Sequence, residues 1–266
     1  MENKHTSYTF DFTSFNLKLE TDWLGRNFSL IDEADSTNCM LMKRDYGFEE
    51  NGTVILAEKQ LNGKGRLERN WLTAKYENLT FSILITNKKL LSVNPFIYNF
   101  GSVVAVARTI ESQYQVQTGV KWPNDLLIGD RKICGILSES VISGSSFTRM
   151  VVGIGLNVNQ TNFLGDYKLE PTSLALELGK EASREKLLAG ILNEFEEIIS
   201  LGERDPQRVL KDWKDRCPLM GDKISIQQGD VIYDGIFDDV DENGALLLRI
   251  NDRTQIFHYG EVSIIQ

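Results

Sequence analysis

The sequence predicts an α+β fold in which a core built on a mixed sheet carries a small β-barrel at its C-terminal end. Continuous apolar runs such as Thr53–Ala57 indicate buried strands. Apolar residues at helical spacing across Arg184–Gly202 indicate an amphipathic helix. About the last 45 residues hold only short strands and turns, a pattern typical of a small barrel. We place the boundary at Cys217–Met220, with a first domain at residues 1–217 and a second at 218–266.

The other elements are predicted from the same two signals, apolar runs for strands and helical spacing of apolar residues for helices. Residues 1–28 are polar with scattered aromatics, and we expect an arm or edge segment there. Pro95–Tyr114 suits a buried helix with proline in its first turn, and Pro206–Arg216 suits a further helix. Another helix should open at Ser36 and end near Gly47. The remaining predicted strands are Phe28–Ile31, Leu79–Ile85, Val120–Ile128, Cys134–Val141 and Phe147–Ile154 in the core, and Lys223–Gln227, Ile232–Val240, Ala245–Ile250 and Gln255–Gly260 in the barrel.

The composition is that of an ordinary globular protein and argues against several classes of function. The 266 residues carry a formal net charge of −9, whereas nucleic-acid binding needs a basic surface. Three cysteines without a C-x-x-C pair indicate free thiols in a reducing compartment. The N-terminal sequence lacks a secretory signal, and no apolar run reaches the ~20 residues that span a membrane. We therefore expect a soluble cytoplasmic protein.

Two kinds of motif can be set aside. Gly63-x-Gly65 begins like a dinucleotide-binding fingerprint, but Glu68 stands where the third glycine belongs. The sequence contains no glycine-rich phosphate loop ending in Gly-Lys-Ser or Gly-Lys-Thr. Its two histidines, His5 and His258, lie far apart, which argues against histidine-based triads and zinc sites.

A basic loop follows the strand at Thr53–Ala57 and is the first candidate site. Lys64, Arg66 and Arg69 lie within six residues of one another, and two glycines there allow close backbone approach to a ligand. Gln60 and Trp71 add an amide and an aromatic wall. Guanidinium groups bind phosphate and carboxylate through paired hydrogen bonds, so the loop suits an anion. Taken alone, a solvated basic loop explains the same residues equally well.

The run Lys121-Trp122-Pro123-Asn124-Asp125 strengthens this interpretation. Proline and the Asn-Asp pair favour a tight turn, which presents a lysine, an amide and a carboxylate together at a strand end. The lysine can meet a phosphate, and the carboxylate can hold Mg²⁺ or a ribose hydroxyl. The alternative is a plain turn with an exposed lysine, although a Trp-Pro pair is unusual for a simple connection.

Three weaker segments complete the set of candidates. Arg131-Lys132 precedes an in-strand glycine, Gly135, which suggests close backbone approach to a ligand. Ser36-Thr37-Asn38 offers small polar groups to a ligand, but a helix N-cap worth ~1 kcal/mol accounts for it as well. Val152–Asn159 adds two glycines and ends in Asn157 and Asn159, and its glycines, like Gly135, can equally serve packing or a bulge.

Together and in this order, these segments resemble the biotin protein ligases. The resemblance covers about residues 23–266 and implies a biotin/lipoate ligase-like core with a Src-homology-3-like C-terminal barrel. Lys121–Leu126, combined with Arg131–Leu137, is its most specific part. The matching residues are Asp35-Ser36-Thr37-Asn38, Gln60, Gly63-Lys64-Gly65-Arg66, Arg69-Asn70-Trp71, Lys121-Trp122-Pro123-Asn124-Asp125-Leu126, Arg131-Lys132, Gly135-Ile136-Leu137 and Gly153-Ile154-Gly155-Leu156-Asn157.

The resemblance implies a two-step ligase that uses ATP and Mg²⁺. The carboxylate of biotin attacks the α-phosphate of ATP to give biotinyl-5′-AMP, and a lysine of a biotin carboxyl carrier domain then attacks this anhydride. Arg66 and Lys132 are the implied catalytic residues, and Asp125 is the candidate metal ligand. The implied biotin-binding residues are Ser36, Thr37, Asn38, Gln60, Gly63, Lys64, Gly65, Arg66, Lys132 and Gly135. The implied ATP-binding residues are Arg66, Arg69, Trp71, Lys121, Asn124, Asp125 and Asn157.

The basic loop departs from the family pattern, and other readings stay open. The family's loop carries arginine, a basic residue and glycine where this chain has Lys64, Leu67 and Glu68, so we expect a weaker hold on the adenylate. A lipoate-protein ligase or octanoyltransferase, and a biotin-binding protein with reduced turnover, are the alternatives. We expect the monofunctional type without a DNA-binding role, as a monomer or a homodimer.

Overall fold

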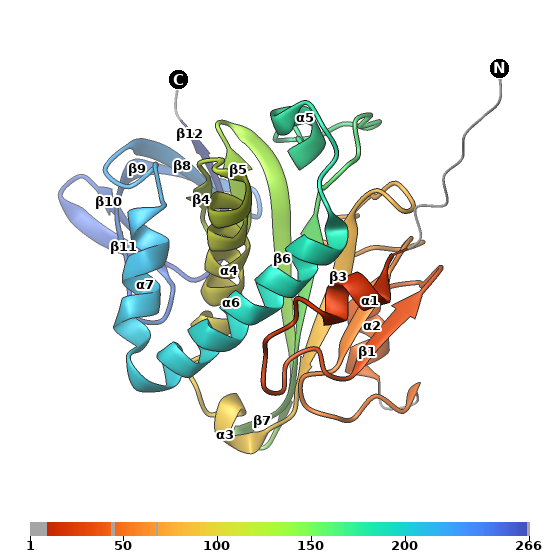
Figure 1. The fold of residues 1–266 in the computed structure, drawn as a ribbon. Helices are drawn as coiled ribbons and strands as arrows, with labels where there is room; N and C mark the ends of the chain where they lie inside the picture. The colour runs from red at the N-terminus through yellow and green to blue at the C-terminus, as the bar shows by residue number, and fades with distance from the viewer. Residues whose placement is uncertain (1–9, 44–45, 68, 265–266) are drawn as a thin grey trace.

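The computed structural model describes residues 10–43, 46–67 and 69–264, which form two β-sheets with helices packed against the larger one (Figure 1). The larger sheet has seven strands in the order β1-β2-β3-β7-β6-β5-β4. Its strands β1 and β2 pair in parallel, and the other neighbours are antiparallel. The predicted α+β fold with a mixed sheet is therefore confirmed.

The element boundaries are as follows. The core strands are β1 (Phe28–Ile31), β2 (Val54–Ala57), β3 (Leu79–Ile85), β4 (Gly119–Lys121), β5 (Asp125–Ile128), β6 (Arg131–Ser143) and β7 (Ser146–Leu156). The C-terminal strands are β8 (Lys223–Gln228), β9 (Val231–Val240), β10 (Leu246–Ile250), β11 (Arg253–Phe257) and β12 (Glu261–Ile264). The helices are α1 (Phe12–Asn16), α2 (Thr37–Met42), α3 (Lys88–Leu91), α4 (Phe96–Tyr114), α5 (Leu174–Leu178), α6 (Arg184–Arg204) and α7 (Pro206–Asp215).

Strand β3 shows how the sheet sorts its side chains between two faces. All seven of its residues are buried, because α2 covers one face of the strand and the main apolar core covers the other. Phe81 and Ile83 belong to the main apolar core. On the opposite face Leu84 packs with Leu41 of α2, next to the polar Ser82. Since successive residues of a strand point to opposite faces, one strand supplies the core and also a polar surface under α2.

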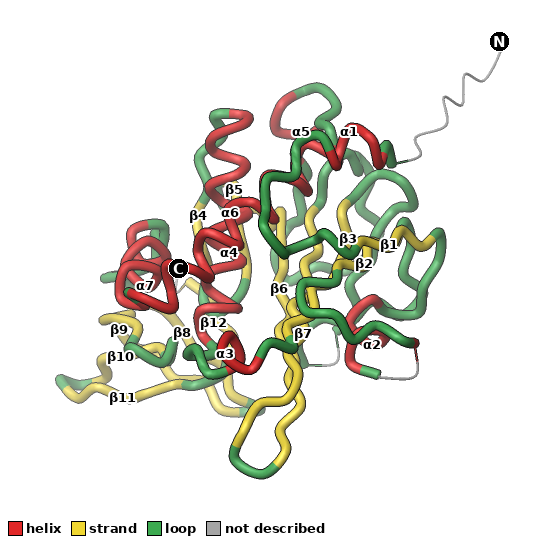
Figure 2. Tube along the Cα trace, turned by 60° about the horizontal axis from the view of Figure 1, so that its bottom comes forward, coloured by secondary structure: helices red, strands yellow, loops and turns green. Residues whose placement is uncertain are grey.

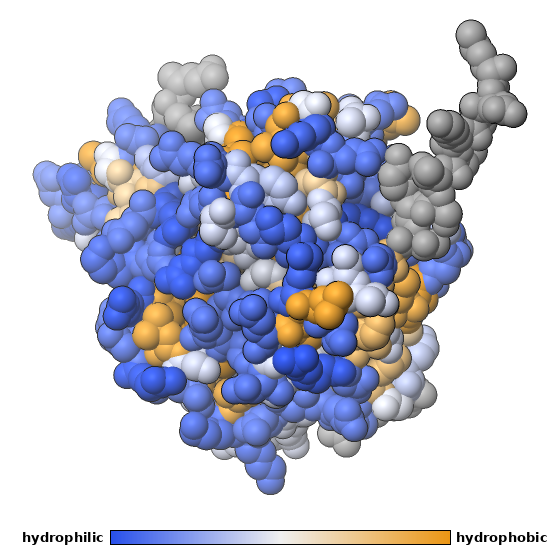
Figure 3. All heavy atoms as spheres, in the orientation of Figure 1, coloured by the Kyte–Doolittle hydropathy of each residue, from blue (hydrophilic) through white to orange (hydrophobic). Residues whose placement is uncertain are grey.

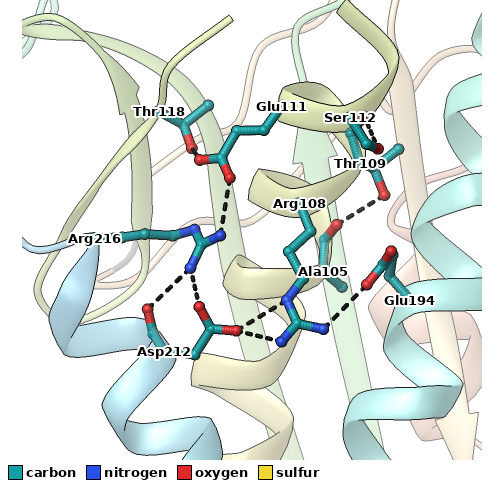
Figure 4. Close-up of polar contacts among 9 residues, drawn as sticks. All are labelled: Ala105, Arg108, Thr109, Glu111, Ser112, Thr118, Glu194, Asp212 and Arg216. Carbon is teal, nitrogen blue, oxygen red and sulfur yellow. Dashed lines mark hydrogen bonds and ion pairs between the residues drawn. The ribbon is translucent and has the colours of Figure 1, made fainter. Parts of the chain in front are cut away.

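Helices α4, α6 and α7 form a layer over one face of the sheet (Figure 1). Glycines allow α4 and α6 to approach closely, because a Cβ atom on Gly101 would meet Ile198 and one on Gly202 would meet Ile97. Arg108 and Arg216 join the three helices through Glu194, Glu111 and Asp212 (Figure 4). The outer surface in this view is mainly hydrophilic, with apolar residues in small separate groups (Figure 3).

The C-terminal strands form an antiparallel sheet in the order β11-β10-β9-β8-β12. This sheet lies on the side of the molecule away from β1 (Figure 2). The sequence predicts a closed barrel here, but among the described strands β11 and β12 do not pair with each other, so the sheet is open. Its inner side chains, including Ile226 and Phe237, belong to the same apolar core as the helices. Trp213 of α7 stacks on Phe100 of α4 at 4.4 Å between ring centroids in this core. The predicted division at residue 217 stays a prediction.

Two local expectations differ from the structure. Helix α2 ends at Met42 rather than near Gly47, because Lys43 is extended and Arg149 of β7 donates a hydrogen bond to the carbonyl of Leu41. The predicted arm contains a short helix, α1, whose Phe15 packs on Phe28. The first nine residues of that arm lie outside the described part. In the part of the chain described, no helix is long and apolar enough to cross a membrane.

A buried ion pair joins α6 to the end of β2. The side chains of Arg184 and Glu58 are 5% and 3% exposed, and both oxygens of the carboxylate accept hydrogen bonds from the guanidinium. Arg184 also donates to the carbonyl of Asn78. These contacts fix the start of α6 against the sheet. Removing one partner of such a pair leaves an uncompensated buried charge, which is strongly destabilising.

We predict that Glu58→Ala lowers the free energy of unfolding by about 3–5 kcal/mol, because Arg184 stays buried without its counter-ion. Urea denaturation followed by circular dichroism measures the change. Asp215→Ala is the matched control, since it breaks the exposed Lys211–Asp215 pair and should cost at most about 0.5 kcal/mol. Equal losses in the two variants would contradict this account of the buried pair.

Candidate active site

The predicted site residues meet in one cleft of about 1220 Å³, which is large enough for two ligands side by side. Its walls come from α2, the basic loop, the β4–β5 turn and the adjoining parts of β6 and β7. The predicted residues that line it are Ser36, Thr37, Asn38, Gln60, Lys64, Gly65, Arg66, Arg69, Trp71, Lys121, Asn124, Asp125, Lys132, Gly135 and Asn157. Gly63 is not among the lining residues, although its carbonyl accepts a hydrogen bond from the Trp71 amide at 2.8 Å.

Backbone hydrogen bonds give the basic loop a regular hairpin-like structure. Lys64 and Asn70 form an antiparallel bridge, and the amide of Gly65 donates to the carbonyl of Arg69 at 2.6 Å. The loop thus turns back on itself and carries its cations over the cleft. Leu67, at its tip, has a positive φ of 53° and is 62% exposed. Glu68 lies outside the described residues.

One end of the cleft is polar and largely uncharged. Ser36 caps α2 by accepting a hydrogen bond from the Cys39 amide, so the N-cap interpretation is confirmed. The Thr37 amide donates to Oε1 of Gln60 at 2.7 Å. Behind these groups, Oγ of Ser82 lies 2.6 Å from both the Thr37 hydroxyl and Oδ1 of Asn38. The side chains of Asn38, Ser82, Thr37 and Gln60 form a continuous hydrogen-bonded row beside α2.

The strand glycines lie directly beneath two side chains of the site. A Cβ atom on Gly153 would overlap the carboxamide of Asn38, and one on Gly155 would overlap the indole of Trp71. Trp71 also lies 3.2 Å from the Cβ position of Gly135. The structure therefore gives these glycines a packing role that serves the site. Nε1 of Trp71 is buried, and no partner for it exists among the residues described.

The opposite end of the cleft is cationic. Nζ of Lys132 lies 2.7 Å from Oδ1 of Asp125 and 5.7 Å from the centre of the Trp71 ring. Arg66 Nη1 donates to Oδ1 of Asn124 at 3.3 Å. Burial lowers the pKa of Arg66 and of Lys121, and the charge of Asp125 partly opposes this in both. Three cations around one carboxylate leave a net positive charge, which suits a phosphate or carboxylate ligand.

The turn that carries Lys121 and Asp125 is anchored from two sides. Trp122, whose peptide bond to Pro123 is cis, donates a hydrogen bond from Nε1 to the carbonyl of Gly244 at 3.0 Å. Asn99 of α4 donates to the carbonyl of Pro123 at 2.9 Å. Gly244 lies in the turn between β9 and β10, so the C-terminal sheet supports this end of the cleft.

Two predicted ATP-binding residues are engaged in contacts within the protein. Asn157 is 3% exposed and donates from Nδ2 to the carbonyl of Thr172 at 3.0 Å. Arg69 forms an ion pair with Glu261 of β12, which also pairs with Lys168 at 2.6 Å. Sequence reasoning missed Glu261, because nothing in its local pattern distinguishes it from other exposed acids. The binding roles of Asn157 and Arg69 stay predictions.

The residues present do not fit a metal ion held by the protein alone. The described part of the chain contains no group of three or more histidine, cysteine, aspartate or glutamate side chains arranged to hold one. The carboxylate of Asp125 already pairs with Lys132, and the neighbouring cations would repel another. The prediction of Asp125 as a metal ligand stays untested, and the arrangement does not favour it.

Comparison with known sequences gives consistent matches along most of the chain. Residues 30–157 match the Biotin/lipoate A/B protein ligase family, and residues 221–264 match the Biotin protein ligase C terminal domain. The biotin–[acetyl-CoA-carboxylase] ligase of Mycobacterium tuberculosis is 30% identical over 247 residues, which cover 89% of this chain and 88% of that protein. The bifunctional ligase/repressor BirA of Bacillus subtilis is 27% identical over 252 residues, which cover 92% and 76%.

Solved structures agree with these matches. The biotin protein ligase from Aquifex aeolicus in complex with biotin and ATP is similar with a TM-score of 0.76 and 26% sequence identity, over 90% of this chain and 98% of that one. The identity to the mycobacterial ligase extends over nearly its whole length, and the two family matches fall on the two sheets in the expected order. The chain therefore belongs to the biotin protein ligase family.

Proposed function

We propose that the protein is a biotin protein ligase that activates biotin with ATP and transfers it to a lysine of a biotin carboxyl carrier domain. The observation that carries this proposal is the division of one cleft into two ends. One end is a row of neutral hydrogen-bonding groups, and the other gathers Arg66, Lys121 and Lys132 around Asp125. Biotin has a neutral head group that suits the first end and a carboxylate that suits the second. ATP has a polyphosphate, which also suits the cationic end.

The cationic end addresses the main difficulty of the first step. The biotin carboxylate and the ATP α-phosphate are both anions, and one must attack the other. An oxygen of the carboxylate forms a bond to phosphorus, and pyrophosphate leaves with the electron pair of the broken P–O bond. Fixed cations reduce the repulsion and stabilise the charge that develops at phosphorus. Lys132 acts here as an electrostatic stabiliser, since ATP rather than the enzyme activates the acid.

The second step is an acyl transfer. The neutral amine of the acceptor lysine attacks the carbonyl carbon of the anhydride, and AMP leaves as the amide forms.

The cleft also helps the first step. Holding biotin and ATP side by side makes the reaction between them effectively unimolecular. Magnesium belongs to this scheme as part of the ATP substrate, because Mg²⁺ is commonly held by substrate phosphates and water with few protein ligands.

The neutral end favours biotin over lipoate. The ureido ring of biotin has both N–H donors and a carbonyl acceptor, whereas the dithiolane ring of lipoate has neither. The amide nitrogen of Gln60 and the hydroxyl hydrogen of Ser36 belong to residues that line the cleft, and a dithiolane offers them no hydrogen-bond acceptor of comparable strength, which discriminates against lipoate. The absence of a DNA-binding role and the choice between monomer and homodimer stay predictions.

A transfer assay tests the proposed function. The protein, biotin, ATP and Mg²⁺ are incubated with a carboxyl carrier domain, and mass spectrometry should show one biotinyl group on one lysine. Thermal-shift measurements with biotin and with lipoate should show stabilisation by biotin alone. Labelling with lipoate instead would favour the lipoate-ligase alternative. Binding of biotin without pyrophosphate release would indicate a binding protein.

We predict that Lys132→Ala lowers biotin-dependent pyrophosphate release on the order of 100-fold or more, because a fixed charge aimed at the reacting groups is lost. The melting temperature should stay close to that of the parent protein, since the Lys132 side chain is 27% exposed. Lys211→Ala, on the outer face of α7, serves as the control and should retain full activity. Parent-like turnover in Lys132→Ala would overturn the assigned role.

We also predict that Gly155→Ala weakens ATP binding, because its methyl group occupies the place of the Trp71 indole and displaces it. The Michaelis constant for ATP should rise several-fold, while biotin affinity measured without ATP changes little. In a Trp71→Ala background the same glycine substitution should add no further loss, since coupled residues show non-additive effects. Additive losses would mean that Gly155 acts independently of Trp71.

A further inference from the structure

The carboxamide of Asn38 is held by groups on both sides. The residue is 4% exposed in the first turn of α2 and lies on the backbone of Gly153. Its nitrogen Nδ2 donates to the carbonyl of Leu137 at 3.1 Å and to Oε2 of Glu139 at 2.8 Å. Its oxygen Oδ1 lies 2.6 Å from Oγ of Ser82. Every polar atom of this amide therefore has a partner.

Glu139 and the carbonyl of Leu137 together determine which way round this amide lies. A carbonyl and an ionised carboxylate can only accept hydrogen bonds, so both amide hydrogens of Asn38 must face them. Turning the amide over would place its oxygen against two acceptors. The hydroxyl hydrogen of Ser82 is then directed to Oδ1 of Asn38, since that atom accepts but cannot donate.

The same order continues to the cleft. With its hydrogen committed to Asn38, the Ser82 oxygen faces the Thr37 hydroxyl at 2.6 Å as an acceptor. The Thr37 amide donates to Oε1 of Gln60, which leaves the amide nitrogen of Gln60 on the side of Gly63. This backbone N–H can only donate, so it orients Gln60 by itself. The order set at Asn38 therefore extends through Ser82 to the Thr37 hydroxyl, and both Asn38 and Thr37 line the cleft.

Glu139 acts from behind the cleft rather than inside it. It is not among the lining residues, yet it lies on β6 four positions after Gly135, with Leu137 between them on the same face. Its charge also reaches Lys64 of the basic loop. The pKa of Lys64 is raised, first by its hydrogen bond to the Cys39 side chain and additionally by Glu139 and Asp35.

We propose that Glu139 is a positioning residue for the biotin head group, fixing the donor and acceptor order of the Asn38, Ser82 and Thr37 side chains. This inference rests on the proposed function and adds a residue that sequence reasoning missed. The alternation of Gly135, Leu137 and Glu139 along one strand face was the available signal. A carboxylate is suited to this task because hydrogen bonds to charged groups are stronger than those between neutral ones.

Isothermal titration calorimetry with biotin alone, followed by steady-state kinetics, tests the proposal. Glu139→Ala should bind biotin about tenfold more weakly, since a hydrogen bond to a charged group is lost. Glu139→Gln keeps an acceptor oxygen and should recover affinity to within about threefold of the parent. The Michaelis constant for ATP should be unchanged in both variants. Ser140→Ala, the exposed next residue of β6, is the matched control and should bind biotin like the parent.

A double-mutant cycle separates positioning from loss of structure. Ser82→Ala should weaken biotin binding, and adding Glu139→Ala should cost little more, because both act through Asn38. If Glu139→Ala fails to fold, the Glu139→Gln and Ser82→Ala variants carry the same comparison. Parent-like biotin affinity in Glu139→Ala, or equal losses for biotin and ATP, would overturn the inference while the proposed function stands. A parent protein that binds no biotin would overturn both.

Discussion

The cleft depends on how closely two side chains approach the backbone of β7. Asn38 and Trp71 lie directly on Gly153 and Gly155, where any Cβ atom would displace them. Because these glycines alternate with the buried Val152 and Ile154, the strand is packed on its core face and open on its site face. The amide and the indole thereby become part of the floor of the cleft, and the neutral and cationic ends are built around them.

The two ends of the cleft are held by different kinds of interaction. The neutral end depends on hydrogen bonds that run from Glu139 through Asn38 and Ser82 to the Thr37 hydroxyl, while the Thr37 amide holds Gln60. The cationic end depends on charge, with Asp125 placed so that Lys132 and Lys121 can lie close together with less repulsion. Binding of an anion adds the counter-charge that this end lacks. Both ends share β6, because Lys132 and Glu139 lie on the same strand.

Much of the fold could be predicted from the sequence, and the reasons are local. Strand β3 was predicted with its observed boundaries, because a continuous apolar run marks a strand that is buried on both faces. The boundaries of β1 were also predicted, although this strand lies at the edge of the sheet and is only partly buried. The motifs were found because their chemistry is concentrated in short segments. Features that depend on distant partners were not found. The early end of α2 depends on Arg149, and the contacts of Glu261 and Trp122 join residues more than 90 positions apart. Closure of a barrel depends on pairing between its edge strands, which the pattern of each strand does not determine.

The hydrogen bond from Trp122 to Gly244 makes the positions of two distant segments depend on each other. Gly244 has a positive φ of 81°, and a side chain there would press on Phe96. Replacing this glycine would therefore displace the β9–β10 turn. A shift of that turn would carry the indole with it and, through the adjoining peptide, the lysine and carboxylate of the β4–β5 turn. The C-terminal sheet is therefore not an exchangeable module. A chimera that took this sheet from a relative would keep the cationic end of its cleft intact only if it also took the face of α4 that carries Phe96 and Phe100.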